Sequence, residues 1–480
     1  MKNSALLTDF YELTMSQGCF LEKKNPAVVF DMFYRSQPFN GGFAVFCGLN
    51  DLIDIIENFH FSQDDISYLR STGIFKDDFL AYLGTFKFSG SIYAMDEGTV
   101  IFPGEPLIRV HSSIIEAQLI ESILLNTINF QTLIATKMSH VFHASNYGKV
   151  LEFGLRRAQG IDGALSASRA AFIGGAFATS NTLAGKNFGI PVNGTMAHSW
   201  VMAFESELES FKVYADIYPD SCSLLIDTYD TLGSGIENAI IVGKEMKAKG
   251  KSIGVRIDSG DLSYLSRNVR DRLDQAGLQD TKIIVSNDLN EDIINLLVSD
   301  GAPIDVWGIG THLVTGGKQS SMNGVYKLAA KMNTEGSFEP TMKVSNTSIK
   351  TTDPGIKQVY RFYGSEGNVL ADLITLDDES IIPGKNYTFL HPFSEADIFI
   401  LHSDEYVEIK PLLKLKIKNG KRIIKSPTLE TIQKNVQNEL KTLHKSYKRL
   451  INPHIYKVSL SPDLKAVKNS LINKFRYRKE

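Results

Sequence analysis

The most constraining feature of the sequence is a rhythm of short apolar runs beyond the first third of the chain. Each run ends in polar or glycine residues and is followed by a stretch with helical spacing of apolar residues. Thr195, Asp227, Asp258, Asp288 and Thr311 close successive runs, at intervals of 32, 31, 30 and 23 residues. Intervals of this size match a repeated strand–helix unit. The pattern therefore predicts parallel strands covered by helices.

The strand ends favour a closed barrel over an open doubly wound sheet. The runs read VLEFG, IPVNGT, SLLIDTYD, SIGVRIDSGD, KIIVSND and DVWGIGT, and each ends in a group suited to catalysis or phosphate binding. Catalytic side chains gather at the C-terminal strand ends of a barrel, whereas an open sheet needs them at one switch point only. We therefore expect an α/β fold with an irregular TIM-like α/β barrel. Gly250 and Gly277 are predicted to end two of the intervening helices.

The segments on either side of the barrel have different patterns. Residues 1–115 predict an N-terminal α/β domain rich in strands, and the barrel core is expected over residues 116–332. Residues 333–480 form a C-terminal extension that is irregular, then strand-like, and finally basic and helical. We expect this extension to pack partly on the N-terminal domain. A chain of 480 residues is long enough for two or three such parts.

The end of the chain is strongly basic. From Lys410 to Glu480 there are 19 Lys and Arg against four Asp and Glu, which leaves 32 basic and 50 acidic residues elsewhere. Such a tail could bind nucleic acid. Its lysines are interspersed with apolar residues at helical spacing, among them Leu440 and Leu443. We therefore expect a solvated helical face packed against the acidic body or a neighbouring subunit, and no nucleic-acid partner.

The cysteines and the N-terminus bear on cellular location. Cys19, Cys47 and Cys222 are far apart, odd in number and outside any CxxC, so neither a disulfide framework nor a zinc site is expected. The first residues lack a signal-peptide pattern, and no apolar run approaches the ~18 residues of a membrane span. We expect a cytoplasmic protein without a membrane partner.

Charged and aromatic side chains follow two of the predicted strands. EFGLRRAQG places Phe153 and Arg156 after the first run, where arginine suits a carboxylate or phosphate. The alternative is a core phenylalanine and a surface salt bridge. In GVRIDSGDL, Arg256 and Asp258 alternate along one strand and so face the same way. A structural ion pair is the other interpretation there, although its desolvation is costly.

Three other strand ends suit a metal, a sugar or a phosphate. In SLLIDTYDTLGSG, Asp227 and Asp230 are placed to hold Mg²⁺ through waters, or the hydroxyls of a sugar. Asp288 follows the next strand but one in SNDL. The glycine-rich turn WGIGTHLVTGG contains Gly310 and Thr311, and its backbone amides can cradle a phosphate.

A single histidine lies in the segment GTMAHSWV. His198 has no second histidine at metal-ligand spacing, and on its own it would be interpreted as a buried structural residue. It follows one strand among several whose ends carry reactive groups, which favours a functional role. The lack of a metal-spaced partner fits a nucleophile better than a metal ligand.

Together these segments resemble nicotinate phosphoribosyltransferases. The matching stretches, collinear over residues 6–317, are LLTDFYELTMSQG, LEFGLRRAQG, SNTLAGKNFGIPVNGTMAHS, IDTYDT, VRIDSGDL and GIGTHLVT. The resemblance implies a homodimer that joins nicotinate to phosphoribosyl pyrophosphate, with Mg²⁺, at sites on the subunit boundary. The products would be nicotinate mononucleotide and pyrophosphate, in the first step of NAD salvage from nicotinate. It further implies that ATP hydrolysis drives this step through phosphorylation of His198.

The resemblance also assigns residues to the pyridine substrate. It implies a ring held between Phe153 and Tyr11, with Tyr11 supplied by the other subunit. The carboxylate of nicotinate would be held by Arg156, Thr195 and Arg256, which offer cationic or hydroxyl partners.

The ribose and phosphates have their own implied partners. Asp227 and Asp258 would face Mg²⁺, the ribose hydroxyls and the positive charge that develops on the sugar. Nicotinamide-using relatives carry an aspartate where this chain has Asn181, and an anion there would repel nicotinate, so Asn181 favours the acid over the amide. The other implied substrate-binding residues are Ser180, Asp288, Gly310 and Thr311.

Two alternatives remain open from the sequence. One is a relative that uses nicotinamide or quinolinate, and the other is a catalytically silent homologue that binds a nucleotide. The joint presence of His198, Asp227, Arg256 and Asp258 favours an active enzyme.

Overall fold

The computed structural model describes residues 5–476 and divides the chain into two compact units. Of the described residues, the terminal unit contains those up to Leu133 and those from Ser321 onward, and the central unit is Ile134–Ser320. Over the described residues, no helix is both long and apolar enough to cross a membrane.

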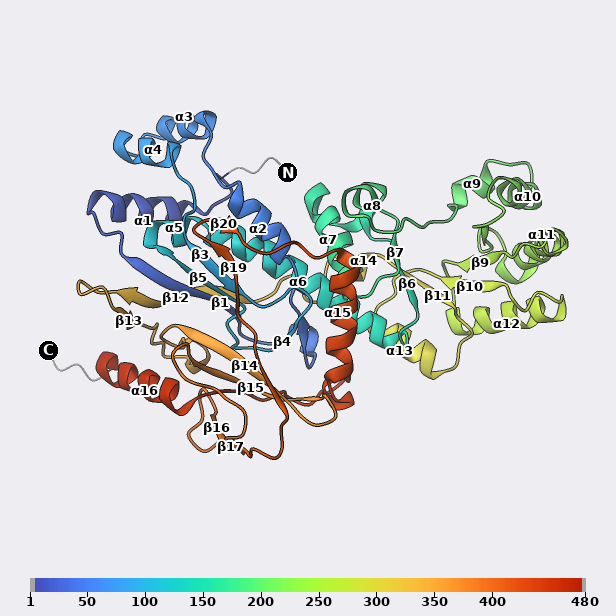
Figure 1. Cartoon of the computed structure of the whole chain (residues 1–480). Helices are drawn as coiled ribbons and strands as arrows, with labels where there is room; N and C mark the ends of the chain where they lie inside the picture. Colours follow the sequence, from blue (N-terminus) through green and yellow to red (C-terminus); the bar gives the residue numbers. More distant parts are fainter. Residues whose placement is uncertain (1–4, 477–480) are drawn as a thin grey trace. The chain divides into compact units, whose positions relative to one another are not determined.

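The central unit is built on a parallel sheet of six strands in the order β7-β6-β11-β10-β9-β8 (Figure 1). Most of their residues are buried, as in a parallel sheet that is covered by helices. Five of the six predicted runs form these strands, which confirms the strand–helix rhythm. The strands are β6 (Lys149–Glu152), β7 (Ala178–Thr179), β8 (Ser223–Leu225), β9 (Gly254–Ile257), β10 (Lys282–Val285) and β11 (Val306–Ile309).

One predicted run is wrong as a strand. In IPVNGT only Val192 pairs, through a single parallel bridge to Thr179. Pro191 has no N–H to donate to a ladder, although its carbonyl accepts a hydrogen bond from the Thr179 N–H. The strand that pairs with β6 is the two-residue β7, which lies between β6 and Val192 and is too short to leave a pattern in the sequence.

Helices follow the strands where the sequence predicts them. The side chains of Asp261 and Asn290 accept backbone N–H groups at the starts of α12 and α13. Gly250 and Gly277 follow α11 and α12 with φ of 72° and 80°, which confirms them as helix stops. The helices of this unit are α7 (Gly160–Gly174), α8 (Thr182–Phe188), α9 (His198–Met202), α10 (Glu207–Ile217), α11 (Ile236–Ala248), α12 (Leu262–Gln275), α13 (Glu291–Ser299) and α14 (Thr311–Val314).

The two ends of the central sheet are brought together by a loop. Beyond β7, the segment after Val192 reaches the far end of the sheet, where His198 lies 3.1 Å from Thr228 after β8. The same loop contacts β9, because Arg256 donates to Thr195. The expected α/β fold with an irregular barrel is confirmed, and the closing side is made by side chains of this loop.

The terminal unit contains a seven-stranded sheet in the order β13-β12-β1-β5-β3-β19-β20. Strands from both ends of the chain pair within it: β12 lies beside β1, and β19 beside β3. The domain boundaries predicted after residues 115 and 332 divide the chain into consecutive parts. This unit instead contains segments from both the beginning and the end of the chain. The strands are β1 (Ala27–Tyr34), β3 (Ser91–Ala94), β5 (Ile108–Ser113), β12 (Gly324–Met332), β13 (Phe338–Pro340), β19 (Lys414–Lys418) and β20 (Lys421–Arg422).

Helices of the terminal unit share one large apolar core with this sheet. They are α1 (Phe10–Leu21), α2 (Leu49–Glu57), α3 (Gln63–Ser71), α4 (Asp77–Gly84) and α5 (Ile114–Leu119), and the small pair β2 (Ala44–Val45) and β4 (Val100–Ile101) lies in the same unit. The long helix α6 (Glu121–Ala144) begins in this unit and ends in the central one.

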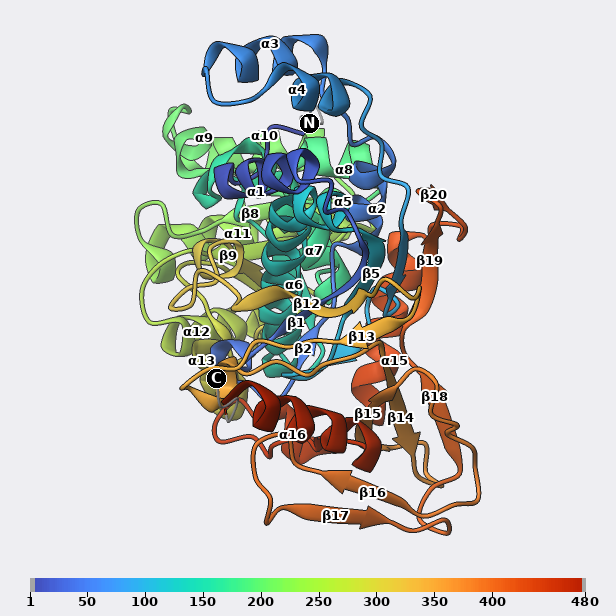
Figure 2. The ribbon, with the colours of Figure 1, turned by 90° about the vertical axis from the view of Figure 1, so that its left-hand side faces the viewer.

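A second sheet of the terminal unit has the order β17-β16-β21-β15-β14-β18 (Figure 2). Its small core includes Phe362, Leu373 and Phe389. Arg361 on β14 and Asp372 on β15 form a fully buried ion pair of 2.7 Å. The strands are β14 (Lys357–Tyr363), β15 (Val369–Leu376), β16 (Tyr387–Leu390), β17 (Ile398–Leu401), β18 (Glu408–Pro411) and β21 (Val458–Leu460).

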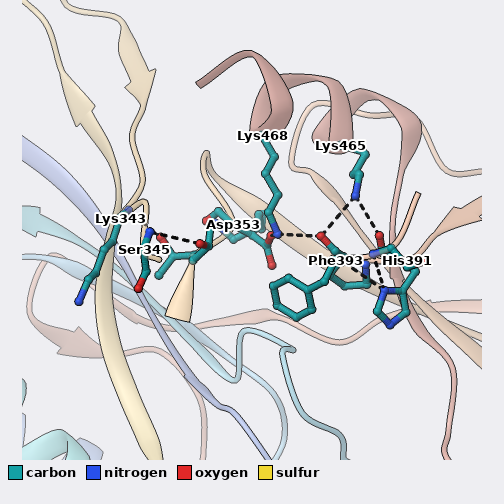
Figure 3. A network of polar contacts seen from close by, with 12 residues as sticks. Lys343, Ser345, Asp353, His391, Phe393, Lys465 and Lys468 are labelled. Atoms are coloured by element: carbon teal, nitrogen blue, oxygen red, sulfur yellow. Dashed lines mark hydrogen bonds and ion pairs between the residues drawn. The ribbon is translucent and has the colours of Figure 1, made fainter. Parts of the chain in front are cut away.

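The basic end of the chain packs through helices and ion pairs. Helix α15 (Leu429–Thr442) buries Leu440 at the predicted apolar position. Lys416 pairs with Asp96, and Lys468 on α16 (Pro462–Arg476) donates to Asp353 Oδ1 over 2.6 Å (Figure 3). These lysines contact acidic residues of the terminal unit, as expected for basic residues packed against an acidic body.

Candidate active site

Arg256 stands at the centre of a polar network on the strand ends of the central unit. Its Nε donates to Ser286 Oγ over 2.9 Å, and Nη1 donates to Thr195 Oγ1 over 2.6 Å and to the Met196 carbonyl over 3.2 Å. Nη2 pairs with Asp258 Oδ1 at 3.0 Å. We call the following residues the Arg256 network: Thr195, His198, Asp227, Thr228, Arg256, Asp258 and Ser286.

The hydrogen bonds of Arg256 limit how it can hold a ligand. A guanidinium group has five N–H donors. The four contacts above leave one Nη2 hydrogen available among the described residues. The Arg256 side chain is 14% exposed, so part of it is open to a small ligand. In this arrangement Arg256 therefore has one N–H available for a ligand. A bidentate contact with a ligand requires Arg256 to release Asp258.

Asp258 has one committed and one open carboxylate oxygen. Ser286 Oγ donates to Oδ1, the same oxygen that Arg256 contacts. Oδ2 lies 3.9 Å from His198 Nε2, and the two side chains are 31% and 42% exposed. The alternation predicted along β9 is confirmed, because Arg256 and Asp258 face the same side. This arrangement leaves a carboxylate oxygen and an imidazole nitrogen open to a ligand.

Asp227 is linked to the network through its Oδ2 atom. Oδ2 accepts from the Asp258 N–H over 2.9 Å and from Ser259 Oγ over 2.7 Å. Oδ1 is buried without a hydrogen-bond partner in the described structure. Asp230, the second acid of this segment, instead caps the turn at Thr231–Gly235 by accepting the N–H of Leu232 and Gly233.

The carboxylates fit a metal that keeps most of its ligands outside the protein. Over residues 5–476, no group of three or more His, Cys, Asp or Glu is arranged to hold a metal ion. The orphaned Asp227 Oδ1 and the open Asp258 Oδ2 provide two oxygen ligands on adjacent strand ends. Mg²⁺ is commonly bound by one or two carboxylates together with waters and substrate phosphates.

Phe153 and the glycine-rich turn lie beside each other at the ends of β6 and β11. The Phe153 N–H donates to the Ile309 carbonyl over 2.7 Å, and its ring centroid is 5.9 Å from Arg256 Cζ. A Cβ on Gly308 would come within 2.8 Å of this ring, so glycine makes room for it. Gly310 and Thr311 follow directly, at the start of α14. An aromatic face, a cation and a turn thus share one region.

A second set of polar residues at the same edge of the sheet is satisfied by hydrogen bonds within the protein. Glu152 is fully buried at the end of β6, where it accepts hydrogen bonds from Gly154 N–H, Ser168 Oγ and Thr179 Oγ1. Asn181 is 2% exposed; its Nδ2 donates to Ser168 Oγ and its Oδ1 caps α8. We call Glu152, Ser168, Thr179 and Asn181 the Glu152 network. Ser180 lies next to it and is partly exposed.

The three predicted residues that remain also lie outside both networks. Arg156 is exposed on a short 3₁₀ turn, Leu155–Arg157. Asp288 is exposed and lines a cleft of about 620 Å³ between the start of α12 and helix α13. Tyr11 lies on α1 of the terminal unit and is 46% exposed, and partial burial and the charge of Glu121 raise its pKa.

Comparison with known proteins gives a consistent family. Profiles described as the nicotinate phosphoribosyltransferase N-terminal domain, family and C-terminal domain match residues 6–129, 148–365 and 356–468. The nicotinate phosphoribosyltransferase of Bacillus subtilis is 42% identical over 99% of this chain and 96% of its own. The chain belongs to the nicotinate phosphoribosyltransferase family.

Other members of the nicotinate phosphoribosyltransferase family match over similar lengths. The Caenorhabditis elegans protein of that name is 37% identical over 96% of this chain and 92% of its own. The crystal structure of human nicotinic acid phosphoribosyltransferase has a TM-score of 0.85 at 28% identity, covering 97% of this chain and 99% of that one. The recognition of the family from collinear motifs is confirmed, and so is the fold.

Sequence reasoning did not single out three polar residues of this family member's site. Thr228 directly follows Asp227, and Ser286 lies two residues before Asp288, so the strand-end pattern that selects these two aspartates could have included both residues. Glu152 lies within the apolar run VLEFG, and its complete burial is not evident from the sequence.

Proposed function

We propose that this chain joins nicotinate to phosphoribosyl pyrophosphate, giving nicotinate mononucleotide and pyrophosphate, with ATP hydrolysis coupled through His198. The Arg256 network carries the proposal. In a member of the family, it gathers a cation, an open carboxylate oxygen on Asp258, an unpaired one on Asp227 and a partly exposed histidine at one edge of the sheet.

The pyridine ring of nicotinate is assigned to the face of Phe153. The available Nη2 hydrogen of Arg256 suits the substrate carboxylate, and the Thr195 hydroxyl holds the other side of that guanidinium. Arg156 is a second cation after the same strand as Phe153. We further propose that the molecule is a homodimer in which Tyr11 of the other subunit covers the ring.

The carboxylates of Asp258 and Asp227 suit the displacement at the ribose. The pyridine nitrogen donates its lone pair to C1 of the ribose, and the bond from C1 to pyrophosphate breaks with its electrons leaving on oxygen. Positive charge builds on the sugar in between, and Asp258 Oδ2 and Asp227 Oδ1 are preorganised anions that stabilise it. Gly310 and Thr311 are assigned to a phosphate, with Asp288 and Ser180 at the margin of the site.

Asp227 and Asp258 are the residues that would hold Mg²⁺. When bound, the ion neutralises charge on the pyrophosphate leaving group. Neighbouring groups fix the orientation of both carboxylates. Ser259 and the Asp258 N–H donate to Asp227 Oδ2, and Ser286 donates to Asp258 Oδ1.

His198 is assigned as the phosphoryl acceptor from ATP. A lone pair of the imidazole forms a bond to the γ-phosphorus as the bond from that phosphorus to the β-bridging oxygen breaks, and ADP departs with the electron pair. Later hydrolysis by water restores the ring and releases phosphate. The 42% exposure of His198 leaves room for this transfer.

We propose that the enzyme prefers the acid, nicotinate, over the amide, nicotinamide. Asn181 provides no negative charge, whereas an aspartate in that place would add a buried anion beside Glu152 and raise the cost of bringing in nicotinate. The three cysteines are free thiols in the structure, which is compatible with the proposed cytoplasmic location.

The test is product formation by the purified chain with phosphoribosyl pyrophosphate, Mg²⁺ and ATP. Separate reactions contain nicotinate, nicotinamide or quinolinate, and both pyrophosphate and mononucleotide are measured. We expect rapid product from nicotinate and little from the other two. Equal turnover of nicotinamide or quinolinate would contradict the assigned substrate, and no product from any of them would indicate a catalytically silent homologue.

A further inference from the structure

Thr228 contacts the ring that we assign as phosphoryl acceptor. His198 is the first residue of α9, and its Nδ1 lies 3.1 Å from Thr228 Oγ1 at the end of β8. On the opposite side of the ring, Nε2 is 3.9 Å from Asp258 Oδ2, which exceeds hydrogen-bond length. Among the described residues, Thr228 is thus the group within hydrogen-bond reach of the imidazole.

Asp258 cannot take over this role without giving up its own contacts. Its other oxygen is bound by Ser286 and Arg256, which fixes the carboxylate relative to β9 and β10. The pair with His198 is partly exposed on both sides, so solvent weakens its attraction. The orientation of the ring therefore depends on Thr228.

Threonine is well suited to hold an imidazole through changes in its protonation. A hydroxyl can donate to an unprotonated ring nitrogen or accept from a protonated one, so the contact survives either state. The branched Cβ restricts χ1, which lets the backbone at the end of β8 determine where the hydroxyl points. Its neighbour Asp227 anchors that backbone by accepting hydrogen bonds from Asp258 and Ser259.

We propose that Thr228 is a positioning residue that holds His198 for phosphoryl transfer, so that coupling of ATP use to synthesis depends on the Thr228 hydroxyl. The inference rests on the proposed function and deepens it. Thr228 acts through His198, and the quantity it controls is the benefit that synthesis draws from ATP.

The experiment compares Thr228→Val, which keeps the branched shape and removes the hydroxyl, with Thr228→Ser, which keeps the hydroxyl. For each full-length variant, nicotinate mononucleotide formation is measured with and without ATP, together with ATP hydrolysed per product. We expect the ratio of the two synthesis rates to fall about tenfold in the valine variant, the loss expected for one hydrogen bond. The serine variant should keep the ratio within about twofold of wild type, and thermal unfolding confirms that both variants fold.

The outcomes separate this inference from the proposed function. An unchanged ratio in Thr228→Val overturns the inference, and so does an equal fall of both rates in that variant, because a structural defect would lower them together. Wild-type protein that makes no mononucleotide refutes the proposed function itself. Wild-type protein that makes mononucleotide without any stimulation by ATP leaves the synthesis standing and overturns the role of Thr228.

Discussion

The Arg256 network and the Glu152 network lie on strand ends of the same parallel sheet, yet they differ in what they leave unsatisfied. Glu152 is fully buried, and three hydrogen bonds from neighbouring groups satisfy it. The Arg256 network keeps an open oxygen on Asp258, an orphaned oxygen on Asp227 and a partly exposed His198. Position at a strand end is common to both, so it does not by itself identify a chemical group.

What separates the two networks is the balance of donors and acceptors. A buried polar group with every partner in place stabilises the fold, whereas an unpaired one is costly unless a ligand or water completes it. We therefore assign substrate chemistry to the unsatisfied groups of the Arg256 network, and a structural role to Glu152 with its donors Ser168 and Thr179.

The largest effect is expected for Asp258→Asn. The substitution keeps the shape but removes the negative charge that we assign to stabilisation of the ribose cation. We expect kcat/KM for nicotinate mononucleotide synthesis to fall by about 10²–10³, the range seen when a preorganised electrostatic partner is removed. Steady-state kinetics provide the measurement, and a loss below fivefold would place Asp258 outside the chemistry.

Arg256→Lys is expected to have the next largest effect. Lysine keeps the charge but cannot donate at once to Ser286, Thr195 and Asp258, because it lacks the planar fork. We expect KM for nicotinate to rise by about tenfold or more, measured by initial rates at saturating phosphoribosyl pyrophosphate. An unchanged KM would mean that Arg256 is only a structural partner of Asp258.

Glu152→Gln should instead act on stability. The amide retains one acceptor oxygen and places an NH₂ group where Glu152 now accepts, so one buried contact is lost. We expect the free energy of unfolding to fall by about 1–3 kcal/mol, measured by denaturant titration. A large loss of kcat in a variant of wild-type stability would contradict the division between the two networks.

Asn181→Asp is expected to have the smallest effect on catalysis. The aspartate would lose the donor to Ser168 and bring a second carboxylate close to Glu152. We expect KM for nicotinate to rise by no more than about fivefold, with KM for nicotinamide unchanged, since this charge acts from a distance. A parallel rise for both substrates would indicate a packing defect without selectivity.

The sequence predicted the sheet better than the details of the site. Runs such as SIGVRIDSGD give parallel strands because their apolar positions are buried, and the polar ends of these strands meet at one edge of the sheet. The bonding of Arg256 to Thr195 was not predictable, because it depends on how a loop 61 residues away in the chain returns to β9. Asp230, expected to hold Mg²⁺ through waters or the hydroxyls of a sugar, caps its own turn, and Asn181 is buried, because local backbone geometry and burial are not written in the residue pattern.

The assignment of chemistry to the Arg256 network is tested most directly by phosphoryl transfer to His198. The wild-type chain and His198→Asn are incubated with ATP labelled at the γ-phosphate, and acid-labile label on the protein is located by peptide mapping. We predict label on the peptide that contains His198 in wild type, and none in the variant, whose ATP-stimulated synthesis is also lost. Label that persists in the variant, or ATP stimulation that survives without His198, would contradict the assignment.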